Sequence, residues 1–204
     1  PRRLDAGFRG IPRDPASNVT ATPVPGAPSL GPVWWRSRSD PDLDVRRQLV
    51  QDSLDGLSVG DALGEQFFGW RHTADDLRAG WLPDAPWRWT DDTCLASTLA
   101  AHVLARGGVA QDRLAAEFAR DFEMGRGFGP SARDLLFAID RGADWRVEAR
   151  IPFGGSGSCG NGSAMRVAPL GAYHHDDLAT AARQAALSAE VTHPHPEGVA
   201  GAVA

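Results

Sequence analysis

The pattern of apolar and polar positions divides the chain near residue 41. Up to that point prolines recur and the apolar residues show no regular spacing. A segment of this composition cannot bury enough apolar surface to offset the conformational entropy that it would lose on ordering. We therefore expect an extended or disordered leader over residues 1–41 and a folded domain over residues 42–204.

The folded part shows the period of α-helices and no convincing alternation of a β-strand, so the predicted fold class is all-α. Capping residues, prolines and glycines set the expected limits of each helix. We expect helices from Leu43 through Leu57, from Thr90 to Gly107, from Leu114 through Phe122 to Gly125, from Ser131 to Gly142, from Asp177 to Thr192, and onward from Pro196. A glycine-rich loop is expected over residues 153–162.

Three glycines at a spacing of four, Gly56, Gly60 and Gly64, mark the far end of the first expected helix. Each glycine disfavours the helical state by about 1 kcal/mol, so their presence on one helix face needs a reason. Either a second helix approaches closely there, or the backbone approaches a ligand. The sequence alone leaves both explanations open.

The composition excludes several classes of protein. The 204 residues include 21 basic ones, all of them Arg, against 26 Asp and Glu, and a formal net charge of −5 argues against a protein that coats nucleic acid. Two cysteines exclude a disulfide framework. No apolar run approaches the roughly 20 residues that cross a bilayer, and no secretory signal is recognisable at the start. These observations predict a cytoplasmic protein whose partner is neither a membrane nor a nucleic acid.

The segment Trp89-Thr90-Asp91-Asp92-Thr93 places hydroxyl groups and two carboxylates at the expected start of a helix. One explanation is an ordinary N-cap followed by acidic residues, which the helix dipole favours. The other is a site for hard cations. Adjacent carboxylates point about 100° apart around a helix, so each can reach a different ion or the pair can bridge two. Oxygen ligands suit Mg²⁺, Mn²⁺ or Ca²⁺ better than zinc.

Two later segments can contact a ligand. Residues 155–163 are rich in glycine and serine and form either a flexible connector or a cradle of backbone N–H groups for phosphate. They match neither a Walker A motif nor a dinucleotide fingerprint. The segment Thr192-His193-Pro194-His195-Pro196 carries two histidines in an extended stretch. A single histidine that hydrogen-bonds a ligand phosphate or a buried carbonyl explains it better than a metal-binding pair.

Four segments, in this order, resemble the ADP-ribosylglycohydrolase family, which includes the dinitrogenase-reductase-activating glycohydrolases. They are residues 56–64 (Gly-Leu-Ser-Val-Gly-Asp-Ala-Leu-Gly), residues 89–93, residues 160–171 (Gly-Asn-Gly-Ser-Ala-Met-Arg-Val-Ala-Pro-Leu-Gly), and Thr192-His193. The resemblance covers about residues 49–204. It implies a compact multi-helix fold with two divalent cations, Mg²⁺ or Mn²⁺, at the base of a cleft.

The resemblance also implies an activity, the hydrolysis of the bond between C1″ of ADP-ribose and a protein side chain or small acceptor. It implies that Thr90, Asp91 and Asp92 are metal ligands, that Asp91 and Asp92 serve catalysis, and that Asp61 lies beside the ions without binding them. Glu65 is the expected further catalytic acid. The expected partner is an ADP-ribosylated protein or a small ADP-ribose conjugate.

For the ligand, the resemblance implies a cradle that holds the pyrophosphate and the neighbouring ribose. Phe153 occupies the position of an aromatic residue that contacts adenine in some relatives, and His193 that of a contact to the diphosphate or ribose. The expected cradle consists of Gly157, Ser158, Cys159, Gly160, Asn161 and Gly162. The tryptophan-rich stretch over residues 69–89 is the expected rim for the acceptor, with ordinary packing of its tryptophans as the alternative.

The sequence departs from the family pattern at three places. Phe68 stands where relatives often carry a glutamate on a mobile flap, and Glu65 is the nearest acid. Cys159 stands where relatives often carry an aromatic residue. No D-x-D-T segment, which completes the dinuclear site in the family, follows Thr93. We therefore expect the N-terminal portion of a hydrolase whose C-terminal part comes from a further segment or a second chain. The alternative is a catalytically incomplete ADP-ribose-binding or regulatory module.

Overall fold

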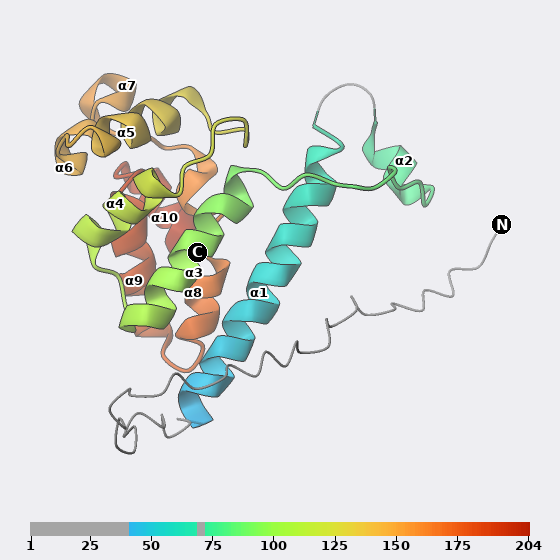
Figure 1. Ribbon diagram of the computed structural model, residues 1–204, viewed down its shortest axis with the longest axis horizontal. Coiled ribbons are helices and arrows are strands. Elements are labelled where there is room, and N and C mark those ends of the chain that lie inside the picture. The colour runs from blue at the N-terminus through green and yellow to red at the C-terminus, as the bar shows by residue number, and fades with distance from the viewer. Residues whose placement is uncertain (1–40, 69–71) are drawn as a thin grey trace, which may run out of the picture. The chain divides into compact units, whose positions relative to one another are not determined.

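The computed structural model describes residues 41–68 and 72–204. The expected leader lies outside these residues, apart from Pro41, which begins the first helix. The described residues form helices and no strand, which confirms the all-α fold class (Figure 1). The helices are α1 (Pro41–Glu65), α2 (Ala74–Arg78), α3 (Asp91–Arg106), α4 (Gln111–Arg120), α5 (Pro130–Asp140), α6 (Trp145–Glu148), α7 (Pro152–Gly155), the 3-10 turn η1 (Asn161–Ser163), α8 (Ala168–Tyr173), α9 (Leu178–Glu190) and α10 (Pro196–Val203). Within the described ranges, none is both long and apolar enough to cross a membrane.

Capping chemistry explains why several helices begin and end where the sequence predicts. The side chain of Asp177 accepts the backbone N–H of Thr180 and so starts α9. α3 ends at Gly107, whose φ of 73° is in the left-handed region that glycine adopts without strain. Pro130 and Pro196 occupy the first turns of α5 and α10, where a missing N–H has no cost.

Two expectations for local structure are wrong. The third expected helix is too long, because α4 ends at Arg120 and Phe122 lies beyond it. The Phe122 ring packs instead against Phe128, with ring centres 4.8 Å apart, and against Phe137, at 5.0 Å. The expected loop over residues 153–162 contains the short helix α7 and the turn η1. The sequence also gave no expectation of α2, α6 or α8.

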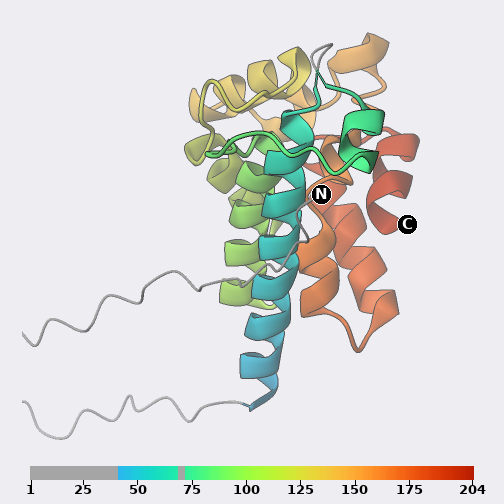
Figure 2. The same cartoon turned by 90° about the vertical axis from the view of Figure 1, so that its right-hand side faces the viewer.

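The hydrophobic core surrounds α3. Leu95, Leu99 and Val103 of this helix are almost fully buried, together with Phe118 of α4 and Leu170 of α8. α3 packs against α1, α4 and α8, and α1 in turn packs against both α3 and α8. In the view of Figure 2, α1 lies in front of α3 and the C-terminal helices, and α3 contacts α8 directly.

An ion pair joins α1 to the segment that follows α8. The Arg46 guanidinium on α1 donates to the Asp176 carboxylate at 2.6 Å and 3.0 Å, and to the backbone oxygen of Tyr173 at 2.5 Å. The same guanidinium lies 5.5 Å from the centre of the Tyr173 ring. These contacts fix the first half of α1 against the end of α8.

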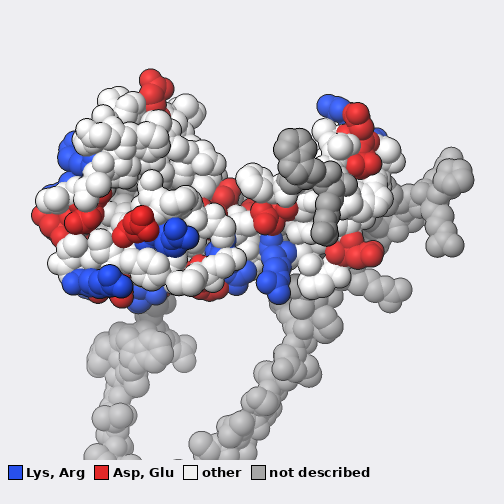
Figure 3. Space-filling view, turned by 90° about the horizontal axis from the view of Figure 1, so that it is seen from above, with Lys and Arg blue, Asp and Glu red and all other residues white. Residues whose placement is uncertain are grey.

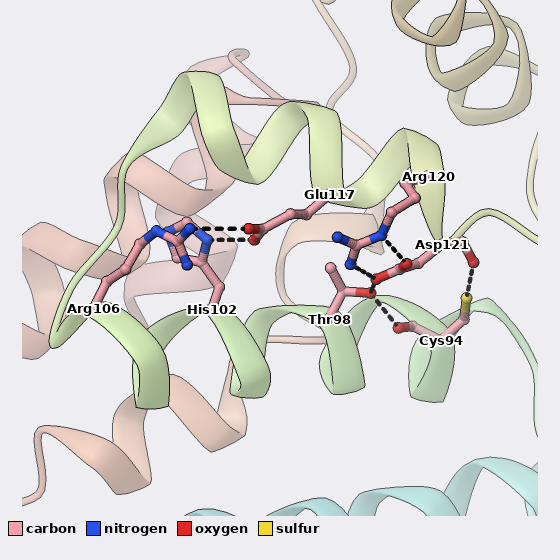
Figure 4. A network of polar contacts seen from close by, with 7 residues as sticks. All are labelled: Cys94, Thr98, His102, Arg106, Glu117, Arg120 and Asp121. Atoms are coloured by element: carbon pink, nitrogen blue, oxygen red, sulfur yellow. Dashed lines mark hydrogen bonds and ion pairs between the residues drawn. The ribbon is translucent and has the colours of Figure 1, made fainter. Parts of the chain in front are cut away.

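Buried polar contacts hold α3 against α4 (Figure 4). His102 Nδ1 lies 2.6 Å from Glu117 Oε2, and its Nε2 accepts the backbone N–H of Ala110 at 3.0 Å. Because Nε2 is an acceptor here, Nδ1 carries the ring proton and donates to Glu117. Thr98 Oγ1 lies 2.9 Å from the Asp121 carboxylate at the other end of the helix pair. The start of α3 is therefore set on a rigid scaffold.

Candidate active site

Asp61 of α1 holds the first turn of α3. Thr90 occupies the N-cap position of α3 but makes no side-chain cap bond. Its hydroxyl donates to Asp61 Oδ1 at 2.6 Å, and its backbone N–H donates to Asp61 Oδ2 at 2.7 Å. Thr93 donates to the same Oδ2 through its N–H at 3.2 Å and its hydroxyl at 2.6 Å. Thr90 thus holds the N-cap position with Asp91 and Asp92 in the first turn, as the N-cap explanation expects, but the capping bonds come from Asp61 of another helix.

This geometry keeps Asp61 ionised. Burial opposes the charged form, but the hydrogen bonds from Thr90 and Thr93 outweigh it and hold the pKa of Asp61 below its usual value. Four donors therefore occupy the Asp61 carboxylate, and two of them come from Thr90.

Asp91 and Asp92 have no ion-pair partner among the described residues. Burial, followed by the charges of Asp92 and Asp61, raises the pKa of Asp91 to about 6. Burial, and then the charges of Asp61 and Glu65, also raise the pKa of Asp92. The ion pairs found among the described residues all involve other carboxylates. A cation between these groups would relieve their mutual repulsion.

The acidic groups line a cavity of about 600 Å³ between the end of α1 and the start of α3, called here the acidic cavity. It brings Glu65 together with Thr90, Asp91 and Asp92, as the resemblance implies. Its full lining is Gly60, Asp61, Gly64, Glu65, Phe68, Thr90, Asp91, Asp92, Gly127, Gly129, Asn161 and Met165. In the view from above, acidic side chains lie at the waist between the part formed by α5–α7 and the part that carries α2 (Figure 3).

The acidic cavity accounts for two of the three glycines of α1. No described atom lies within 4 Å of the Cβ position that Gly56, Gly60 or Gly64 would have with a side chain. Close packing of a second described helix is therefore not the reason for these glycines. Gly60 and Gly64 instead leave open the wall of the acidic cavity.

The donors at the acidic cavity fit a hard divalent cation in type. One hydroxyl and two carboxylates supply oxygen ligands of the kind that Mg²⁺ and Mn²⁺ prefer. Within residues 41–68 and 72–204, no group of three or more His, Cys, Asp or Glu side chains is arranged to hold a metal ion. The structure therefore supplies oxygen donors of the right type in Thr90, Asp91 and Asp92, and their role as metal ligands stays a prediction.

A second cavity of about 180 Å³, called here the glycine-lined cavity, adjoins the first. The two share Asp91, Gly129, Asn161 and Met165 in their walls. The predicted ligand-binding residues that line the glycine-lined cavity are Phe153, Ser158, Gly160, Asn161, Gly162 and His193. Gly157 and Cys159 do not line it. Gly157 has a φ of 82°, and a Cβ at this position would lie 2.5 Å from Cγ of Pro194. Backbone conformation and close packing therefore explain why this residue is glycine.

Phe153 stands at the edge of the glycine-lined cavity in a strained conformation. Its φ of 55° and ψ of 44° lie in the left-handed region, which a bulky residue rarely adopts. Its side chain remains 63% exposed. An exposed aromatic side chain on a strained backbone is typical of a residue that contacts a ligand.

His193 is buried and neutral. Its ring packs on Gly162, where a Cβ would collide with Cε1 and Nε2, so only glycine fits there. Burial, and then the positive charge of Arg166, lower the pKa of His193 to about 4. The imidazole therefore serves as a hydrogen-bonding group and not as a cation at neutral pH.

Sequence reasoning missed several residues of the site. Gly127, Gly129 and Met165 line the acidic cavity, and a Cβ on Gly127 would lie 3.5 Å from Asp91 Oδ1. The signal was a Gly-Phe-Gly-Pro turn in front of α5, whose spatial position the sequence does not reveal. Arg166 was also missed because its role depends on contacts with distant segments.

The expected rim is only partly described, since Trp70 lies outside the described residues. Trp81 stacks on His72 with ring centres 4.0 Å apart, and Phe67 meets the Trp81 ring edge-on at 6.0 Å. Phe68, beside this aromatic cluster in sequence, is 90% exposed and lines the acidic cavity. Trp89 lies under the Arg126 guanidinium, 3.3 Å from the ring centre, and so serves packing.

Comparisons with known proteins identify the family of the chain. The chain is 33% identical over 119 residues to the ADP-ribosylhydrolase ARH3 of Gallus gallus, covering 56% of this chain and 32% of that protein. It is 28% identical over 196 residues to the ADP-ribosylarginine hydrolase Tri1 of Pseudomonas putida, covering 89% of this chain and 51% of that one. A solved structure described as an ADP-ribosylglycohydrolase-related protein complex matches with a TM-score of 0.55 and 26% identity, over 78% of this chain and 54% of that one.

The chain spans about half the length, or less, of these relatives. The sequence model of the ADP-ribosylglycohydrolases matches residues 42–204, which include all the residues of both cavities. The chain therefore belongs to the ADP-ribosylglycohydrolase family.

Proposed function

We propose that this chain takes part in metal-dependent hydrolysis of the bond between C1″ of ADP-ribose and a modified protein side chain or small acceptor. One observation carries the proposal: the acidic cavity and the glycine-lined cavity adjoin and share Asp91 and Asn161. A ligand held in the glycine-lined cavity would thus extend its far end to the carboxylates.

The glycine-lined cavity has groups suited to an ADP-ribose diphosphate. The turn η1 begins at Asn161, and the first N–H groups of a helical turn lack partners within it. His193 adds a neutral donor, and Phe153 offers a ring face for adenine. Stacking of a base on such a ring contributes about 1–3 kcal/mol to binding.

Thr90, Asp91 and Asp92 would hold a divalent cation in the acidic cavity, with Asp61 orienting the Thr90 hydroxyl. A cation there lowers the pKa of a bound water and orients ribose hydroxyls. Ribosyl transfer develops positive charge at C1″, which the carboxylates of this cavity would stabilise. Glu65, on the same wall, would accept the proton that the attacking water loses.

The test is release of ADP-ribose from modified peptides in the presence of Mg²⁺ or Mn²⁺. The names of the relatives suggest an arginine-linked peptide as one substrate, and a serine-linked peptide tests a second linkage. Asp91→Asn and Asp92→Asn should each lower turnover at least about a hundredfold while the far-UV circular dichroism is unchanged. The matched control is Asp134→Asn on α5, whose carboxylate is largely exposed. Near-normal turnover in either site variant would refute the assignment.

A second candidate is a catalytically incomplete ADP-ribose-binding or regulatory module. The observation that favours it is that the described residues hold no group of three or more His, Cys, Asp or Glu side chains arranged to bind a metal ion. The same experiment separates the two, because such a module binds ADP-ribose in calorimetry and releases none from either peptide.

A further inference from the structure

Arg166 is a buried cation without a carboxylate partner among the described residues. It is fully buried, and its guanidinium donates to the Gly162 oxygen at 3.0 Å, to Thr192 Oγ1 at 2.8 Å and to the Ser188 oxygen at 2.8 Å. Its Cζ lies 4.5 Å from the centre of the Phe118 ring. A buried charge is costly when no opposite charge compensates it, so its position beside Gly162 of the glycine-lined cavity calls for a reason.

The contact between Arg166 and Thr192 determines the direction of the next hydrogen bond. A guanidinium is only a donor, so Thr192 Oγ1 must accept from it. The single hydroxyl proton of Thr192 is then free to donate, and His193 Nδ1 lies 2.8 Å away. If Nδ1 carried a proton instead, the Thr192 hydroxyl would have no acceptor among its described neighbours.

This order of donors places the proton of the neutral imidazole on Nε2. That atom lies against Gly160 and Gly162, which both line the glycine-lined cavity with His193 itself. His193 Nε2 makes no hydrogen bond to any described residue. It is therefore a donor prepared for an acceptor atom that enters the cavity.

We propose that Arg166 and Thr192 form a relay that fixes His193 as the Nε2–H tautomer, so that His193 donates this proton to an anionic oxygen of bound ADP-ribose. The binding half of this inference rests on the proposed function, whereas the tautomer half concerns the ligand-free chain alone. Arg166 and Thr192 are positioning residues, since they act through His193.

The first experiment determines the tautomer by long-range proton–nitrogen NMR on the full chain with isotope-labelled histidine. The His193 signals are assigned by their loss in His193→Gln. We expect an unprotonated Nδ1 and a protonated Nε2 in the ligand-free protein. A proton on Nδ1 overturns the relay. In Thr192→Val, which keeps the shape and removes the hydroxyl, the Nε2–H tautomer should lose its dominance, and an unchanged tautomer also overturns it.

The second experiment measures ADP-ribose binding by calorimetry. Thr192→Val should weaken binding about tenfold, and Thr192→Ser, which restores the hydroxyl, should bind as the unchanged chain does. The matched control is Thr98→Val on α3, because Thr98 and Thr192 are equally buried at 5% exposure and Thr98 lines neither cavity. Equal losses in the two valine variants would mean a general structural effect and would overturn the positioning role.

The two hypotheses fail in different ways. If the unchanged chain shows the Nε2–H tautomer and binds no ADP-ribose, the proposed function and the donor role fail, and the relay stands. If the chain binds ADP-ribose and Thr192→Val binds it equally well, the donor role fails and the proposed function stands.

Discussion

Replacing Asp61 by alanine should uncouple the start of α3 from α1. Four donors from Thr90 and Thr93 converge on this carboxylate, three of them on Oδ2. A buried donor left without its acceptor costs about 1–3 kcal/mol, and an acid at a helix N-terminus adds about 0.3–1 kcal/mol. Water reaches Thr90, and removing the charge relieves repulsion with Asp91 and Asp92, so these gains offset part of the loss. The net expectation is a free energy of unfolding lower by about 2–3 kcal/mol.

Urea unfolding followed by circular dichroism at 222 nm, a wavelength that reports helix content, measures this loss as a shift of the midpoint at constant slope. The matched control is Asp52→Ala on the same helix, since Asp52 is exposed and accepts one hydrogen bond from Gln48. An exposed pair of this kind contributes about 0.2–0.5 kcal/mol, and alanine favours the helix slightly. If Asp61→Ala loses no more stability than Asp52→Ala, the external capping of α3 by Asp61 is wrong.

Three further predictions concern the two cavities. The pKa of His193 lies near 4 in the folded state against 6.5 for the free side chain, so the unfolded state binds more protons between these two pH values. The contribution of His193 to stability is therefore complete above about pH 6.5. It falls by at most about 1.4 kcal/mol per pH unit as the pH drops toward 4. Urea titrations at several pH values should therefore show a shallower decline in His193→Gln, and equal slopes would contradict the assignment. Phe153→Gly should change the free energy of unfolding by less than about 1 kcal/mol, because relief of the left-handed backbone strain offsets the greater conformational entropy of glycine in the unfolded state. In calorimetry the same variant should bind ADP-ribose about tenfold more weakly. Unchanged binding would exclude the stacking role of Phe153. Gly60→Ala should stabilise α1 by about 0.5–1 kcal/mol in thermal or urea unfolding, because its Cβ meets no described atom within 4 Å, and a loss of stability would mean that the position is packed.

Local chemistry made much of the helical framework predictable. Asp177 and Gly107 are residues whose capping preferences act over a few neighbours, so the ends of α9 and α3 follow from the sequence. Phe122 has the spacing of a helical core residue and is partly buried, but it packs on Phe128 and Phe137 from beyond the end of α4. Periodicity cannot distinguish these two ways of burying one ring.

The candidate site was predictable as a set of motifs and not as an arrangement. The Thr-Asp-Asp segment suggested a metal site, yet its link to Asp61 on another helix is a tertiary contact that spacing does not encode. The same holds for Arg166, which joins Gly162 to Ser188 and Thr192. The metal, catalytic and ligand-binding roles of these residues remain predictions, whereas their common location is a property of the structure.

The contact between Arg46 and the end of α8 has a consequence for how the chain folds. It closes a loop of 127 residues, whereas the His102–Glu117 contact between α3 and α4 closes one of only 15. Short loops close first because they lose less entropy, so the α3–α4 pair is expected to form early and the first half of α1 to dock on α8 late. The contact between Asp61 and Thr90 at the acidic cavity closes a loop of 29 residues, so this part of the cavity is expected to form between those two steps. A fluorescent probe at this cavity would follow its formation separately from helix formation.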